Sequence, residues 1–352
     1  MAEDPPPHLN TLMSAALRAL QPVHSPAQRS AVAVLGCMLQ NCSGKKKKAM
    51  RLAGFVDAAI HWLPSFRSTD TRIFSLMAAC ALARPQQLPP LMAVLLPDLM
   101  DADVDVVMLH VAVEGLDLTI RCWNMPLEEL IGSGEAAAAV ATRVVQLLAH
   151  PSDEILQTAW HICSHLWNDG ADQQLLLDAG LLQPVHFEHA MASRRDGVRF
   201  DSILFLSFCA FNDSTARVIV ERGLLPTILT ACDTNAAVVR CAITTLFCCV
   251  KAADQPDAAS LRPSVLQACT AATFPSAATA RLMTEDQQLV DSLQKIIPAW
   301  SSLLQWLESA VDSARLHPLV QRLVDAGLLP HIEGQSHKRA GVNCGSFSHG
   351  AG

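Results

Sequence analysis

The chain has 352 residues, of which 51% are hydrophobic and 17% are charged. This balance is typical of a folded globular chain and excludes an intrinsically disordered one, which has few apolar residues and a high net charge. The net charge of −7 gives no general attraction to phosphate groups, so we do not expect DNA binding.

The first ten residues carry acids and prolines where a secretory signal would have basic residues and an apolar core. We expect residues 1–10 to form a flexible N-terminal segment. No apolar stretch reaches the length of about 18 to 20 residues that a spanning helix needs, so we expect no transmembrane segment. The 12 cysteines lie mostly in apolar surroundings, which fits a reducing compartment. We therefore expect a cytoplasmic protein, with the nucleus as the alternative.

Apolar residues recur with helical spacing along the chain, and short polar links separate these segments. The pattern predicts long helices over residues 27–40, 71–83, 104–118, 155–167, 198–211 and 236–250. Strand signals such as hairpin turns and alternating apolar residues are nearly absent. The sequence therefore predicts an all-α fold.

A dense charge run, formed by Lys45, Lys46, Lys47 and Lys48, lies between the first two predicted helices. One interpretation is a solvated loop. The other is a patch for an acidic partner or a lipid headgroup, because each lysine near an anionic surface contributes about 1 kcal/mol.

One phrase recurs along the chain. It reads LDAGLLQP at residues 177–184, VERGLLP at 220–226 and VDAGLLP at 324–330, with a weaker copy, RLAGFV, at 51–56. Gly180 and Gly223 are 43 residues apart, and three intervals of 42 separate Gly54 from Gly180. The glycine can end one helix in the left-handed conformation, and the proline suits the first turn of the next. The longer interval before Gly327 predicts an irregular segment near residues 252–280.

The period and the phrase resemble the armadillo repeat family, whose repeat carries Gly-apolar-apolar-Pro before its second helix. The match is best over residues 153–185, which are similar to repeats of nuclear-import adaptors. The resemblance implies a right-handed α-solenoid of about six to seven three-helix repeats over residues 11–334. We expect residues 335–352, which contain Gly, Ser and His, to form a flexible tail.

In the armadillo family the third helices line a concave groove. The resemblance places Trp160 in that groove and implies that Gln157, His161 and Ser164 bind a partner beside it. Ser164 stands where import adaptors have an asparagine. The same position holds Cys37, Phe208 and Cys248 in other predicted third helices. Because the asparagine ladder is missing, the resemblance supports the fold and not the recognition of nuclear signals.

No motif in the sequence carries enzyme chemistry. His161 and His165 are one helical turn apart, which suits a shared metal, but a third ligand is missing. His186 and His189 lack the order His-Glu-x-x-His of a zinc protease. No cysteine has the setting of a catalytic nucleophile, and no phosphate-binding loop is present. We expect no metal, no cofactor and no catalytic activity.

These observations lead to two hypotheses of function. The first is a monomeric, non-enzymatic scaffold or adaptor that binds a peptide or a helix of a protein partner in the groove. The alternative is a regulatory or exchange-factor-like subunit that clamps a folded NTPase or kinase through its rim.

Overall fold

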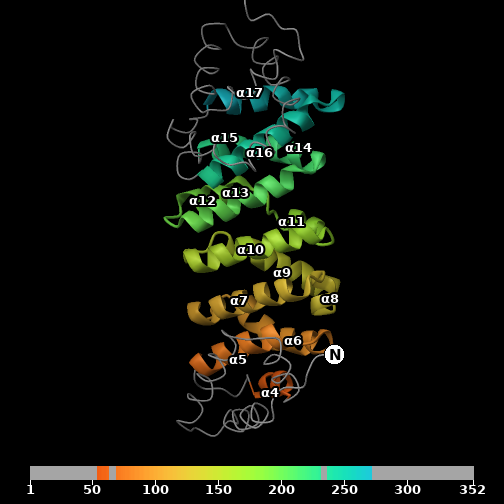
Figure 1. The fold of residues 1–352 in the computed structure, drawn as a ribbon, viewed down its shortest axis with the longest axis vertical. Helices are drawn as coiled ribbons and strands as arrows, with labels where there is room; N and C mark the ends of the chain where they lie inside the picture. The colour runs from red at the N-terminus through yellow and green to blue at the C-terminus, as the bar shows by residue number, and fades with distance from the viewer. Residues whose placement is uncertain (1–53, 63–68, 231–235, 272–352) are drawn as a thin grey trace, which may run out of the picture. The chain divides into compact units, whose positions relative to one another are not determined.

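The computed structural model describes residues 54–62, 69–230 and 236–271. This part of the chain forms α-helices and two short 3-10 helices and contains no strand, which confirms the predicted all-α class. The chain divides into two compact units, with the boundary between Leu181 and Leu182. Figure 1 shows the helices of each unit stacked in layers.

The first unit repeats a simple order, in which short helices lead into a longer one. Its elements are α4 (Phe55–Trp62), α5 (Thr69–Leu82), η2 (Pro85–Gln87), α6 (Leu88–Met100), α7 (Val106–Trp123), α8 (Leu127–Ile131), α9 (Gly134–Leu147), α10 (Asp153–Asp169) and α11 (Gln173–Asp178). The long helix α7 packs against α5, α6 and α10, and α10 packs also against α9 and α11. The predicted long helices at 71–83, 104–118 and 155–167 correspond to α5, α7 and α10.

Local chemistry sets where these helices begin and end. The Asp105 carboxylate accepts a hydrogen bond of 2.9 Å from the Val107 N–H and caps the start of α7. Asn124 ends α7 in the left-handed conformation, with φ of 47°. The buried Asp172 carboxylate accepts a hydrogen bond of 2.9 Å from the Leu127 N–H, which ties the start of α8 to the segment before α11.

A glycine allows α7 to approach its neighbours closely. A Cβ atom at Gly115 would lie 2.8 Å from Leu95 Cδ1 and 3.3 Å from Cys80 Sγ. The Gly115 carbonyl also accepts a hydrogen bond of 2.7 Å from the buried Thr119 hydroxyl. One side of α7 is therefore fixed against α5 and α6, which leaves its opposite side for α10 and solvent.

The second unit has the same kind of order. Its described elements are α12 (Pro184–Ala192), α13 (Asp196–Ala210), α14 (Asp213–Glu221), α15 (Leu224–Thr230), α16 (Ala236–Asp254), η4 (Pro256–Leu261) and α17 (Arg262–Ala271). The long helix α13 packs against α12, α14 and α16. The predicted long helices at 198–211 and 236–250 correspond to α13 and α16.

The three described glycines of the recurring phrase have the predicted conformation. Gly54, Gly180 and Gly223 have φ of 71°, 86° and 69°, in the left-handed region that favours glycine. At Gly180, the N–H of Gly180 bonds the Leu177 carbonyl and the N–H of Leu181 bonds the Leu176 carbonyl, so α11 ends in a Schellman motif. The phrase therefore marks helix junctions.

Several predictions fall on residues outside the described ranges. They concern the segments 1–10 and 335–352, the helix at 27–40, Lys45 to Lys48 and the phrase at 324–330. Of the segment 252–280, the described residues up to 271 complete α16 and form η4 and α17. Within the described ranges, no helix is both long and apolar enough to cross a membrane.

Candidate functional site

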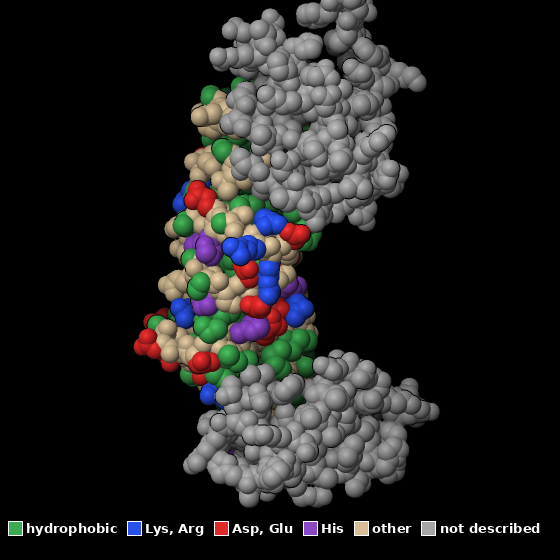
Figure 2. Space-filling view, turned by 90° about the vertical axis from the view of Figure 1, so that its left-hand side faces the viewer, with side chains coloured by type: hydrophobic (Ala, Val, Ile, Leu, Met, Phe, Trp, Pro, Cys, Tyr) green, Lys and Arg blue, Asp and Glu red, His purple; other side chains and the backbone are tan. Residues whose placement is uncertain are grey.

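The half-buried and exposed stripes of α7 and α10 carry polar and ionisable side chains. The stripe of α7 contains His110, Glu114 and Arg121, and that of α10 contains Glu154, Gln157, His161, Ser164 and His165. We call these eight residues the α7–α10 face. Figure 2 shows one side of the molecule, on which histidine, acidic and basic side chains lie among uncharged ones.

The two helices share a register that brings these side chains together in pairs. Glu114 and Thr158 are 44 residues apart and form a hydrogen bond of 2.7 Å. Because both helices have the same rise and period, the same offset brings Asp117 opposite His161 and Arg121 opposite His165. Electrostatic interactions between the members of both pairs support this register.

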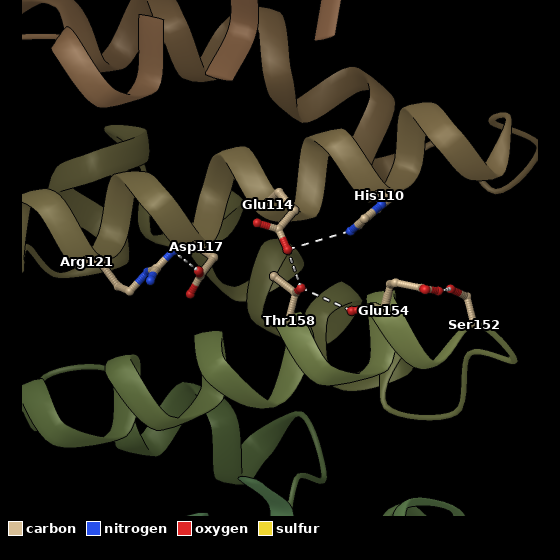
Figure 3. Close-up of polar contacts among 7 residues, drawn as sticks. All are labelled: His110, Glu114, Asp117, Arg121, Ser152, Glu154 and Thr158. Atoms are coloured by element: carbon tan, nitrogen blue, oxygen red, sulfur yellow. Dashed lines mark hydrogen bonds and ion pairs between the residues drawn. The ribbon is translucent and has the colours of Figure 1, made fainter. Parts of the chain in front are cut away.

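The Glu114 carboxylate is held from two sides, as Figure 3 shows. Its Oε1 accepts the hydrogen bond of the Thr158 hydroxyl and lies 3.6 Å from His110 Nε2 on the previous turn. The Thr158 hydroxyl also lies 3.1 Å from the Glu154 carbonyl, but its single hydrogen serves one acceptor at a time. The Glu114 side chain is 34% exposed, so its carboxylate is both positioned and open to a ligand.

Asp117 lies one turn further along α7 and is almost completely buried. Its side chain is 2% exposed, and its Oδ2 lies 2.8 Å from Arg121 Nη2, whose side chain is 46% exposed. Its Oδ1 has no hydrogen-bond partner among the described residues. Burial raises the pKa of Asp117 to about 6, and this effect outweighs the opposing effects of Arg121 and His161.

His165 lies at the end of the same face. Burial lowers the pKa of its imidazole, and the nearby Arg121 and His161 lower this pKa further. A cationic charge at His165 is therefore disfavoured while Arg121 is close.

The comparisons with known proteins identify the fold. No protein-family model matches the chain, and no curated protein matches it. Among solved structures, a designed armadillo repeat protein in complex with the peptide (KR)4 matches with a TM-score of 0.54 and 16% identity, over 67% of this chain and 99% of that chain. An engineered protein matches with a TM-score of 0.54 and 18% identity, over 68% of this chain and 97% of that chain.

A third match is a chain from a study of a phosphorylation switch that controls the interaction between cadherin and beta-catenin. It has a TM-score of 0.61 and 14% identity, over 94% of this chain and 61% of that chain. The chain has an armadillo-like repeat fold. In the first unit, α7 and α10 are long helices that pack against each other, and we interpret them as the third helices of successive repeats.

The structure corrects the predicted position of Trp160. The armadillo resemblance placed this side chain in an open groove, but its exposed fraction is 0% and it belongs to the core. The reason is the wide apolar face of α10, on which every member of two adjacent rows is buried. These rows contain Ile155, Leu156, Ala159, Trp160, Ile162, Cys163, Leu166 and Trp167.

The other three predicted partner-binding residues lie away from this apolar face. Gln157, His161 and Ser164 are half-buried and occupy the side of α10 that carries Glu154. Sequence reasoning missed Glu114, Asp117, Arg121 and Thr158. Two signals point to them: the opposite charges of Asp117 and Arg121 one turn apart on a predicted helix, and an offset of 44 residues that is close to the repeat length.

The described part of the chain holds no group of three or more His, Cys, Asp or Glu side chains arranged to bind a metal ion. Burial raises the pKa of Cys80 to about 12 and of the half-buried Cys248 to about 11. Burial also raises the pKa of Cys163. These thiols stay protonated near neutral pH, and a protonated thiol is a poor nucleophile.

Proposed function

We propose that the chain is a non-enzymatic protein-binding scaffold that holds a peptide or a helix of its partner along the α7–α10 face. The observation that carries this proposal is the paired arrangement of polar side chains on α7 and α10, two long helices that pack against each other. Gln157, His161 and Ser164 follow one another at intervals of one turn on α10, and Glu114 is positioned beside them by Thr158.

The dimensions of the face suit an extended peptide that crosses the helices. Packed helices lie about 8 to 10 Å apart, and an extended chain advances about 3.3 Å per residue. A peptide therefore passes from one third helix to the next in about three residues. The Gln157 amide and the Ser164 hydroxyl each donate and accept hydrogen bonds, so they can bond the peptide backbone of such a ligand.

Two further observations support a protein partner. The designed armadillo repeat protein that this chain resembles in fold was solved with a bound peptide. The net charge of −7 disfavours the phosphate backbone of a nucleic acid as the ligand. We propose that the chain performs this binding as a monomer.

Peptide display on the full chain tests this proposal. The selected peptide is then titrated, by fluorescence anisotropy, with the wild-type chain and with the double variant Gln157→Ala/Ser164→Ala. Losing two hydrogen bonds at an interface costs about 2 kcal/mol, so we expect the variant to bind about 30-fold more weakly.

Glu129 provides the matched control. It is an exposed residue on α8, which packs against α6 and α9, so Glu129→Gln should leave the affinity unchanged. The proposal is wrong if no peptide is enriched over a blank surface, or if the double variant binds the selected peptide as tightly as the wild type does.

A further inference from the structure

Asp117 is a buried carboxylate with an incomplete set of hydrogen bonds. Its Oδ2 is paired with Arg121 at 2.8 Å, whereas its Oδ1 has no partner among the described residues. Figure 3 shows the two side chains side by side on α7, above α10. Burial of a charged carboxylate is costly unless both oxygens are satisfied, and the ionised form has one hydrogen-bonded ion pair, with Arg121.

The charged groups around Asp117 come from two helices. On α7, Arg121 favours the ionised carboxylate and Glu114 opposes it, and on α10 His161 favours it. The helices α5 and α6 also pack on α7. Their described ionisable side chains are those of Cys80, Arg72 and Asp98. Cys80 interacts with Thr119, and Arg72 forms an ion pair with Asp98. None of the three is among the groups that shift the pKa of Asp117.

We propose that Asp117 is a proton-controlled latch for the α7–α10 face. The ionised carboxylate holds the Arg121 guanidinium against α7, and protonation releases that guanidinium into the face. In this step a hydronium ion gives one proton to the Asp117 carboxylate, so that one O–H bond forms on Asp117 and one breaks in the hydronium ion, and no other bond of the chain changes. Its role in partner binding rests on the function proposed above.

Protonation changes the charge that the face presents to a partner. A neutral Asp117 leaves the positive charge of Arg121 uncompensated at the face. The pKa of about 6 places the change in Asp117 just below neutral pH. Mild acid therefore weakens the binding of a cationic ligand and strengthens that of an anionic one.

The direction of the pH effect on stability follows from linkage. The pKa of Asp117 is raised from 3.8 to about 6 in the folded chain, so the folded state binds this proton more tightly than the unfolded state does. Protonation of Asp117 therefore stabilises the fold. This stabilisation is absent well above the folded pKa and grows as the pH falls through about 6.

Thermal unfolding of the full chain from about pH 8 to about pH 5 tests the latch without any partner. We expect the melting temperature of the wild type to begin to rise relative to that of Asp117→Asn once the pH falls below about 6. Asp213→Asn is the control, because Asp213 pairs with Lys251 at the surface, where their side chains are 44% and 62% exposed. This control should run parallel to the wild type, and parallel curves for Asp117→Asn as well would overturn the proposal.

Arg121→Gln separates a latch from a merely structural contact. Because Arg121 lowers the pKa of Asp117, its removal should move the onset of this rise to higher pH, and an unmoved onset would contradict the coupling. A carbon NMR titration of the wild-type aspartates should show one carboxyl with a midpoint near 6, whether or not the variants fold. NMR of the arginine side chains should show one guanidinium become mobile over the same range. These measurements involve no ligand. A negative result would therefore refute the latch, and the proposed peptide binding would still be decided by the display experiment.

Discussion

Replacing Trp160 by alanine tests the position of this side chain directly. The ring is completely buried, and a buried tryptophan removes about 150 to 250 Å² from water. At about 25 cal/mol per Å², this area corresponds to about 4 to 6 kcal/mol, part of which the alanine side chain retains. We therefore expect Trp160→Ala to lower the free energy of unfolding by about 3 to 5 kcal/mol.

Urea unfolding followed by far-ultraviolet circular dichroism measures this loss. Gln157→Ala is the matched control on the same helix, because Gln157 is half-buried and its replacement should cost less than about 1 kcal/mol. A loss below about 1 kcal/mol for Trp160→Ala as well would place the ring at the surface and refute the core assignment.

Two further predictions concern backbone positions and use the same unfolding assay. Gly180→Val and Gly223→Val should each destabilise the chain by about 1 to 3 kcal/mol, because φ is 86° and 69° at these positions, and unchanged midpoints would mean that these helix junctions are misplaced. Gly115→Ala should cost about 1 to 3 kcal/mol, because the added Cβ would lie 2.8 Å from Leu95 Cδ1. Gly134→Ala is the control and should leave stability unchanged or raise it by up to about 1 kcal/mol, because its Cβ would lie 3.5 Å from the nearest atom. Equal losses of stability for the Gly115 and Gly134 variants would contradict the close packing of α7.

The helical class and the long helices could be predicted from the sequence because burial of one helical face imposes a period of 3.6 residues. The junctions at Gly54, Gly180 and Gly223 could also be predicted, because a left-handed residue at a helix end favours glycine. Other junctions could not. Gly132 has the same conformation with φ of 85°, but it follows the short helix α8 and lacks the rest of the phrase.

The candidate site was only partly predictable. Gln157, His161 and Ser164 lie on one side of a predicted helix, and their spacing alone places them together. The prediction that Trp160 faces a groove was wrong because it followed the alignment with the armadillo family. The apolar rows of α10 include this position and already indicate that it is buried. The pairing of Glu114 with Thr158 and the burial of Asp117 depend on which sides of α7 and α10 meet, and helical periodicity within one segment does not determine that register.

Hydrogen exchange of the full chain, with and without a display-selected peptide, tests the proposed binding face most directly. Bound peptide should slow the exchange of amides in α7 and α10, because ligand contacts stabilise the helices that make them. The amides of α8 and α9 should change less. Protection confined to α8 and α9, or to the second unit, would show that the partner binds elsewhere and would contradict the proposed role of the α7–α10 face.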